Sequence, residues 1–204
     1  MESQRLVILS GGLPGRENDY VAWYRDQHLG DIVAIDGVLA GQLCTADPPV
    51  AAGGRHVAAV YDIAPDAAGP IFAEIARRRG TPAFPQTDAF NPPVTVFSVA
   101  RARGPWKPAS SVEAQSTHRL IALGVEAETM DLLGDTPGGW RAYSVESVPG
   151  RPPSPWSSLS YAAVSPSDPA AFLAQACTRC GASGFAREED FLGLFRQIAQ
   201  KSRS

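Results

Sequence analysis

The sequence lacks the features of several common protein classes. It has 204 residues but only three cysteines, too few for a disulfide framework, so we expect reduced thiols and a cytoplasmic location. No apolar run approaches the roughly 20 residues of a membrane span, and the apolar stretch near the start is shorter than a secretory leader needs. Positive charge is not in excess, since 18 Lys and Arg face 21 Asp and Glu. Nucleic-acid binding, which needs a broad basic surface, is therefore not expected.

Signatures of cofactors and metals are also missing. The glycine-rich stretch at residues 11–15 lacks the ending of a phosphate-binding loop and the spacing of a dinucleotide fingerprint, so we interpret it as a turn. Cys177 and Cys180 form a CxxC pair at the end of a predicted helix, whereas redox pairs of this spacing sit at the start of one. Three scattered histidines and one further cysteine do not complete a zinc site. We expect neither a metal nor a cofactor.

The sequence does contain enough apolar residues, 44%, for a packed core. In residues 1–101 the pattern predicts the order strand, helix, strand, strand, helix, strand. The strands are expected at 5–10, 38–45, 55–63 and 94–100, and the helices at 18–31 and 65–79. This βαββαβ unit is an antiparallel four-stranded sheet with both helices on one face. The other face must then be buried against something else.

A similar pattern returns in residues 118–204, after a polar, proline-bearing stretch at 102–117 that we interpret as a linker. Strands are predicted at 118–125, 140–147 and 159–164, with a short helix at 126–133 and a longer one after Asp168. Residues 187–200 have the pattern of a helix where the first half has a strand, so the second copy is predicted to be degenerate. We predict an α+β fold of two tandem ferredoxin-like units whose sheets form a barrel with a ligand pocket between them. One chain would close its own barrel as a monomer, or pair as a homodimer.

The most informative stretch is the predicted helix at 18–31. At about 100° per residue, six polar or aromatic side chains fall within one arc: Tyr20, Trp23, Tyr24, Gln27, His28 and Asp31. The carboxylate of Asp31 is within helical reach of His28 and could orient the imidazole and raise its pKa. His28 is therefore the candidate general acid or base, with Trp23 and Tyr24 lining a pocket. A histidine that caps the helix end is the alternative.

Other ionisable residues give weaker signals. On the predicted strand 55–63, His56 and Asp62 share a face that should point into the barrel, where His56 could orient a ligand or, as the alternative, touch solvent. His118 follows a polar linker, so we expect it to be exposed. The run of three arginines at 77–79 most simply complements a helix C-terminus, with a grip on a phosphate or carboxylate as the alternative.

One stretch of the sequence resembles the signature of EthD-like proteins in the dimeric α/β-barrel superfamily. It consists of the W-Y-x-x-x-H run at residues 23–28, followed by Leu29, Asp31 and the segment Ile-Asp-Gly-Val at 35–38. The sequence departs from this signature at Gly30 and Asp36, where prolines are common. The resemblance covers about residues 5–100. It implies a ferredoxin-like fold with a pocket between sheet and helices, and it marks His28 as the functional position.

Members of this superfamily include cofactor-independent monooxygenases, lactone isomerases, polyketide cyclases and decarboxylases, and haem enzymes. The resemblance implies a cofactor-independent lyase, isomerase or monooxygenase that acts on a small aromatic or polyketide-like substrate by proton transfer through His28. Trp23 and Tyr24 would contact this substrate, and Asp31 or His56 would orient it. Two alternatives stay open: a non-catalytic small-molecule-binding or accessory protein of a catabolic pathway, and a haem-binding barrel with a histidine as axial ligand.

Overall fold

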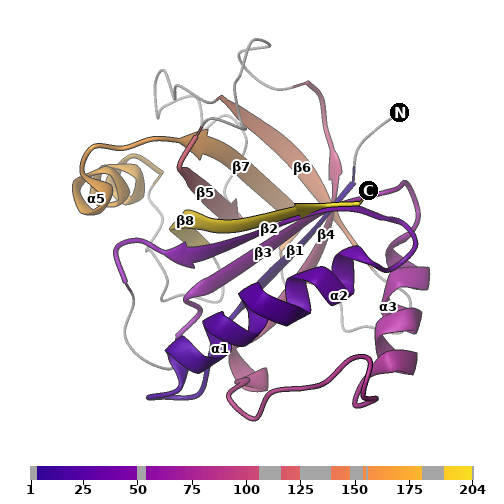
Figure 1. Ribbon diagram of the computed structural model, residues 1–204. Helices are drawn as coiled ribbons and strands as arrows, with labels where there is room; N and C mark the ends of the chain where they lie inside the picture. Colours follow the sequence, from indigo (N-terminus) through magenta and orange to yellow (C-terminus); the bar gives the residue numbers. More distant parts are fainter. Residues whose placement is uncertain are drawn as a thin grey trace.

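The computed structural model describes residues 4–49, 54–105, 116–124, 139–147, 154, 156–180 and 191–203. Within these residues, eight antiparallel strands close into one barrel (Figure 1). The strands are β1 (Gln4–Ser10), β2 (Val38–Ala46), β3 (Val57–Ile63), β4 (Val96–Ala102), β5 (His118–Leu123), β6 (Trp140–Glu146), β7 (Ser158–Val164) and β8 (Phe191–Ser202).

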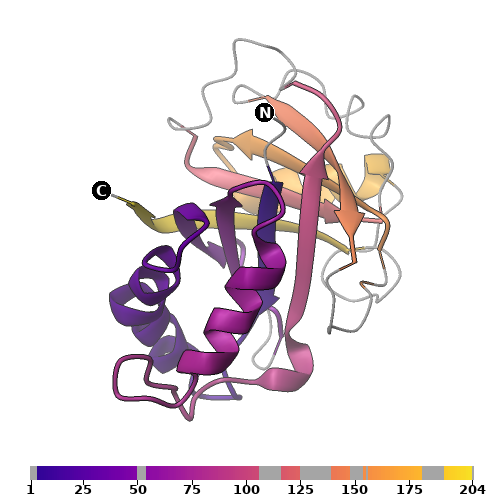
Figure 2. The same cartoon turned by 90° about the vertical axis from the view of Figure 1, so that its right-hand side faces the viewer.

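Helices cover the outer face of the barrel on two sides (Figures 1 and 2). In the first half, α1 (Glu17–Trp23), the π-helical turn η1 (Tyr24–His28) and α2 (Leu29–Val33) follow one another without a break. They pack beside α3 (Ala68–Arg78), and a 3-10 turn, η2 (Pro92–Val94), leads into β4. In the second half, α5 (Pro169–Cys180) lies over the opposite part of the barrel.

The strand order shows that the barrel is made of two equivalent units. In the first unit the order across the sheet is β4-β1-β3-β2, and in the second it is β8-β5-β7-β6. Each unit joins the other through its edge strands, because β2 pairs with β8 and β4 pairs with β6. The prediction of two ferredoxin-like units that form one α/β barrel within a single chain is confirmed.

The prediction of a helix at residues 187–200 is wrong, because β8 occupies 191–202 as a strand. Both faces of its first half are buried: Phe191 and Phe195 face the barrel interior, while Leu192 and Leu194 pack on the α5 side. The second unit therefore ends in a strand, as the first does, and is not degenerate at this element. The predicted helix at 126–133 and most of the predicted linker lie outside the described residues.

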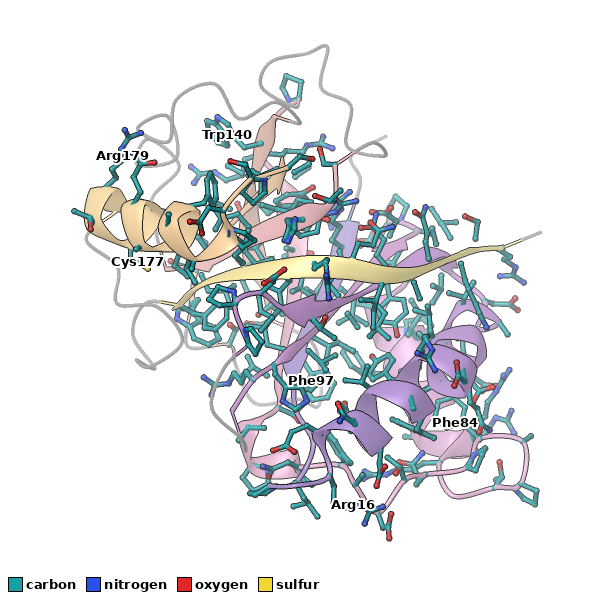
Figure 3. All side chains as sticks on the ribbon, turned by 60° about the vertical axis from the view of Figure 1, so that its left-hand side comes forward. Arg16, Phe84, Phe97, Trp140, Cys177 and Arg179 are labelled. Carbon is teal, nitrogen blue, oxygen red and sulfur yellow. The ribbon has the colours of Figure 1, made fainter. Side chains whose placement is uncertain are left out.

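Alternate residues of each strand point to opposite sides of the barrel wall. On β3, Ala58 and Val60 face the interior, while Val57, Ala59, Tyr61 and Ile63 pack under the helices, as predicted from the alternation. The interior is packed with side chains from both units: large ones such as Tyr143, Tyr161 and Phe195 come from the second unit, and smaller aliphatic ones come from the first. Trp140 and Cys177 lie on the α5 side of the second sheet, whereas Phe84 and Phe97 lie near the helices of the first (Figure 3). In the part of the chain that the structure describes, core side chains lie between the two sheets, where a ligand pocket was expected, and the cavity described below lies on the outer face.

Candidate functional site

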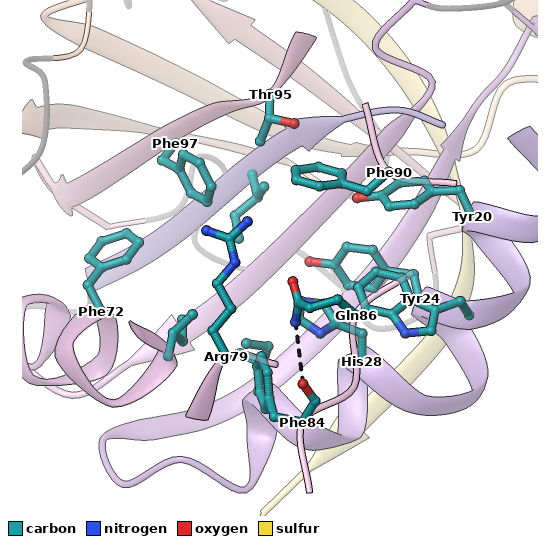
Figure 4. A pocket seen from close by; sticks show the side chains of 14 residues that line it. Tyr20, Tyr24, His28, Phe72, Arg79, Phe84, Gln86, Phe90, Thr95 and Phe97 are labelled. Atoms are coloured by element: carbon teal, nitrogen blue, oxygen red, sulfur yellow. Dashed lines mark hydrogen bonds between the residues drawn. The ribbon is translucent and has the colours of Figure 1, made fainter. Parts of the chain in front are cut away.

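A cavity of about 120 Å³ lies between the first sheet and its helices (Figure 4). Apolar cavities of about 150 Å³ bind benzene, so this one encloses about one aromatic ring. Its walls come from β1, the helical segment α1-η1-α2, α3, the loop after α3, and β4. The lining residues are Ile8, Tyr20, Trp23, Tyr24, His28, Ile32, Phe72, Ile75, Arg79, Phe84, Gln86, Phe90, Thr95 and Phe97.

The π-helical turn η1 determines where His28 lies in this cavity. A π-helical turn brings residues five apart into register, and such turns occur often at functional sites. The rings of Trp23 and His28 accordingly stack, with centroids 4.3 Å apart. The rings of Tyr24 and Phe84 meet His28 edge-on at 4.8 and 5.2 Å. Three aromatic rings therefore hold the imidazole in one orientation.

This aromatic surrounding makes His28 a neutral group. Burial lowers the pKa of His28 to about 4, because the cation loses its hydration and gains no compensating partner. Its buried Nδ1 atom has no hydrogen-bond partner, and neither has the buried Oδ2 atom of Asp31. Asp31 lies outside the cavity lining. The expectation that Asp31 raises the pKa of His28 is therefore wrong, since the ring stacks on Trp23 and the desolvation of the charged form dominates.

Tyr20 and Tyr24 line the cavity with their rings, while their hydroxyl groups form hydrogen bonds with other residues. The hydroxyl of Tyr24 lies 3.0 Å from that of Tyr61, and the hydroxyl of Tyr20 donates to Ser10 Oγ at 2.9 Å. Burial raises the pKa of Tyr20 to about 12 and that of Tyr24 well above its usual range. Both phenols are therefore neutral near pH 7, and their hydrogen bonds fix the rings that shape the cavity.

The two other histidines lie away from the cavity. His56 precedes β3; its Nδ1 atom lies 3.1 Å from the carbonyl oxygen of Gly54, and its ring centroid lies 6.4 Å from that of Tyr20. The exposure expected for His118 is wrong, because that side chain is buried where β5 begins. Its Nε2 lies 3.0 Å from Asp47 Oδ2, at the end of β2. The barrel closure that joins the two units covers His118.

Sequence reasoning missed the side of the cavity formed by the loop between α3 and β4. This loop supplies Phe84, Gln86 and Phe90, and Arg79 stands at its start, directly after α3. An irregular loop has no periodicity from which a facing direction can be derived. Two phenylalanines in a loop rich in proline and polar residues were the available signal, because exposed loops seldom carry large apolar side chains.

The described residues give no sign of a metal centre or of a membrane-spanning helix. No three His, Cys, Asp or Glu side chains gather there as metal ligands would. Cys177 and Cys180 lie in the last turn of α5, at the helix end predicted from the sequence. No described helix has the length and apolar character needed to cross a membrane.

Comparison with known proteins identifies the fold. No sequence family matches the chain, and no curated protein sequence matches it. Among solved structures, an anthrone oxidase-like protein superposes with a TM-score of 0.56 at 12% identity, over 98% of this chain and 93% of the other. A candidate chlorite dismutase superposes with a TM-score of 0.51 at 11% identity, over 98% and 96% of the two chains. At these identities the likeness shows the fold alone, which is that of the dimeric α/β-barrel proteins.

A haem does not fit the described cavity. A porphyrin is a macrocycle several times larger than the single ring that the cavity encloses. The imidazole of His28 is stacked on Trp23 and meets two more rings at its edges, so no ring-sized space adjoins it on the stacked side. Both nitrogens of His118 lie within hydrogen-bond distance of protein oxygens, Thr117 Oγ1 and Asp47 Oδ2. We therefore derive no step through a haem in this cavity.

Proposed function

We propose that the protein is an enzyme that removes a proton from a small aromatic or polyketide-like substrate, with His28 as the base. The observation that carries this proposal is the neutral imidazole in an aromatic, ring-sized cavity, with its pKa lowered to about 4 and with no hydrogen-bond partner on Nδ1. Near pH 7 such a group is always in the form that accepts a proton. The W-Y-x-x-x-H run on which this geometry depends also supports an EthD-like relationship within the shared fold.

The low pKa restricts the substrate to acidic O–H or C–H groups. A weak base removes a proton at a useful rate only when the resulting anion is well stabilised, as in a phenolate or an enolate conjugated with a ring. The proton would move to the imidazole while the electron pair stays on the substrate. The substrate anion would then raise the pKa of the adjacent imidazolium. Lyase, isomerase and cofactor-free monooxygenase reactions share this first step, so the proposal covers all three classes.

Trp23 and Tyr24 would hold the substrate ring in this scheme. Trp23 and Phe84 flank His28 on two sides, at centroid distances of 4.3 and 5.2 Å. Aromatic walls favour a planar substrate through stacked and edge-on contacts. Asp31 and His56, which do not line the cavity, would act on the substrate only indirectly.

Deuterium exchange tests the proton-transfer step without knowledge of the natural substrate. We would follow exchange of the benzylic methylene of phenylacetone, a single-ring compound in which this methylene lies between the ring and a ketone, by proton NMR in D₂O. The wild-type protein should accelerate exchange over buffer, and His28→Gln should lose about 100-fold of that acceleration or more. His118→Gln is the matched control, because its side chain lies away from the cavity. A folded His28→Gln variant with wild-type acceleration would remove His28 from the mechanism.

The second candidate function, binding without conversion, has one observation in its favour. The cavity lining contains no carboxylate, so the described residues provide no acid to complement the base. This candidate predicts that phenylacetone binds, with a change in tryptophan fluorescence, while its exchange rate stays at that of buffer. Binding together with accelerated exchange would exclude it.

A further inference from the structure

The three consecutive arginines after α3 have different surroundings. Arg77 binds both carboxylate oxygens of Glu74, with Nε and Nη2 each 2.7 Å from an oxygen. Arg78 also donates to Glu74, from Nε at 2.5 Å. The side chain of Arg79 makes no hydrogen bond or ion pair with any described residue, and it lines the cavity. Glu74 thus satisfies two of the three arginines and leaves the third for a ligand.

Arg79 also dominates the electrostatics of the cavity. Among its lining residues there is no Asp or Glu, and His28 is neutral near pH 7. Arg79 therefore contributes the one full charge among the described lining residues. Figure 4 shows its side chain reaching from the end of α3 into the ring of aromatic side chains, between Phe72 and Phe97 on one side and Gln86 and His28 on the other.

Several of the remaining polar groups of the lining are bonded within the protein, whereas the buried Nε1 of Trp23 and Nδ1 of His28 have no hydrogen-bond partner. The amide nitrogen of Gln86 donates to the carbonyl oxygen of Phe84 at 3.4 Å, and the hydroxyl of Thr95 donates to the carbonyl oxygen of Asn91 at 3.2 Å. The phenol of Tyr20 donates to Ser10. Beside the indole N–H of Trp23, the guanidinium of Arg79 is the charged donor of this lining, and it presents a planar fork of N–H donors.

We propose that the cavity takes an aromatic substrate that carries a carboxylate, and that Arg79 binds this carboxylate. The inference rests on the proposed function of the same cavity and adds the class of substrate. A guanidinium pairs with a carboxylate through two parallel N–H···O bonds, and one cation balances one negative charge. The substrate ring lies among the aromatic side chains, with its carboxylate at Arg79 and its acidic O–H or C–H group at His28. Arg79 fixes which end of the substrate meets the base.

Calorimetric titration with benzoate and with benzamide, its neutral analogue of the same shape, tests this inference. At low ionic strength the wild-type protein should bind benzoate about tenfold more tightly than benzamide. In Arg79→Gln this preference should disappear, while the affinity for benzamide stays within about threefold of wild type. Arg77→Gln is the matched control: it removes one charge from the same run, but from a side chain that Glu74 holds outside the cavity. It should keep the preference for benzoate.

The outcomes separate this inference from the proposed function. Equal binding of benzoate and benzamide by the wild type would overturn the role of Arg79 and leave the aromatic cavity intact. Loss of the preference in both arginine variants would also overturn it, because the effect would then be one of net charge. If neither compound binds, the cavity does not hold an aromatic ring, and the proposed function fails together with the inference.

Discussion

Burial of His28 in the folded protein makes protonation of its imidazole unfavourable. Its ring is surrounded by Trp23, Tyr24 and Phe84, so protonation inside the folded protein creates a cation with reduced hydration and no partner. The unfolded chain has no such restriction, and its histidines titrate near pH 6.5. The difference between these two states makes protonation of His28 a measurable part of the stability of the protein.

Stability should therefore fall in mild acid by an amount that depends on His28. With a folded pKa of about 4, the unfolded state alone takes up this proton between pH 6.5 and pH 4. The contribution of His28 to the free energy of unfolding is complete above pH 6.5, declines as the pH falls, and is lost below pH 4. The total change is about 3 kcal/mol. Urea unfolding at pH 7 and pH 4 measures it.

The His28→Gln variant isolates this effect from other titrations. The wild type should lose about 3 kcal/mol more between the two pH values than His28→Gln does. Equal losses in the wild type and His28→Gln would mean that the imidazole is hydrated in the folded protein.

At the scale of elements, the cavity depends on how closely α2 approaches β2. Gly41 on β2 makes this approach possible: a Cβ atom there would lie 2.8 Å from Cδ1 of Tyr61 and 3.0 Å from Cδ1 of Leu29. Both side chains are fully buried. Gly41→Ala should therefore lower the free energy of unfolding by about 1–3 kcal/mol, as overpacking does in other cores. Chemical denaturation measures the change.

Gly69, in the first turn of α3, is the matched control for this substitution. A Cβ atom at Gly69 would meet nothing within 4 Å beyond its neighbours in the chain. Gly69→Ala should change the free energy of unfolding by less than about 1 kcal/mol, because the restriction of the unfolded chain by alanine is opposed by contact of its Cβ atom with the ring of Pro70. If both variants behave alike, the contact between α2 and β2 is looser than the structure indicates.

The same elements show what the sequence could predict and what it could not. Strands such as β3 have one face under the helices and the other inside the barrel. They are short and strongly apolar, and their positions were predicted from that pattern. In β8 both faces are buried, so Phe191, Leu192, Leu194 and Phe195 are spaced as they would be on one side of a helix. The spacing of apolar residues alone therefore cannot distinguish a strand that is buried on both faces from a helix that is buried on one side. The tertiary structure, which buries both faces of β8, determines that it is a strand.

The candidate site was predictable only where it lies on a regular element. Trp23, Tyr24 and His28 share a helical segment, and their proximity was predicted from its spacing. The π-helical turn that stacks His28 on Trp23 has no sequence signature, so the lowered pKa of the imidazole was not predicted. Arg79 was placed in the predicted helix, but α3 ends at Arg78 and the backbone of Arg79 is not helical, so helical spacing does not give the direction of its side chain.

At the scale of the whole molecule, closure of the barrel makes the two units interdependent. Each unit pairs its edge strands with the other, and buried polar groups cross the same boundary. Arg119 on β5 is fully buried and donates to Gln42 on β2 at 2.9 Å and to Gln197 on β8. It also donates to the carbonyl oxygens of Ser116 and His118 at 2.8 and 3.0 Å. One side chain of the second unit thus satisfies acceptors in both units.

Arg119→Met should therefore weaken both units equally. The substitution keeps most of the side-chain volume but removes the guanidinium donor from two buried carbonyl oxygens and two half-buried amide oxygens, at a cost of about 3 kcal/mol after the desolvation of the guanidinium is relieved. Native-state hydrogen exchange should show the same loss of protection for amides of β3, in the first unit, and β7, in the second. Arg196→Met on β8, where the side chain is mostly exposed, should cost less than about 1 kcal/mol. A loss confined to β7 would mean that the units unfold independently, although their strands form one closed sheet.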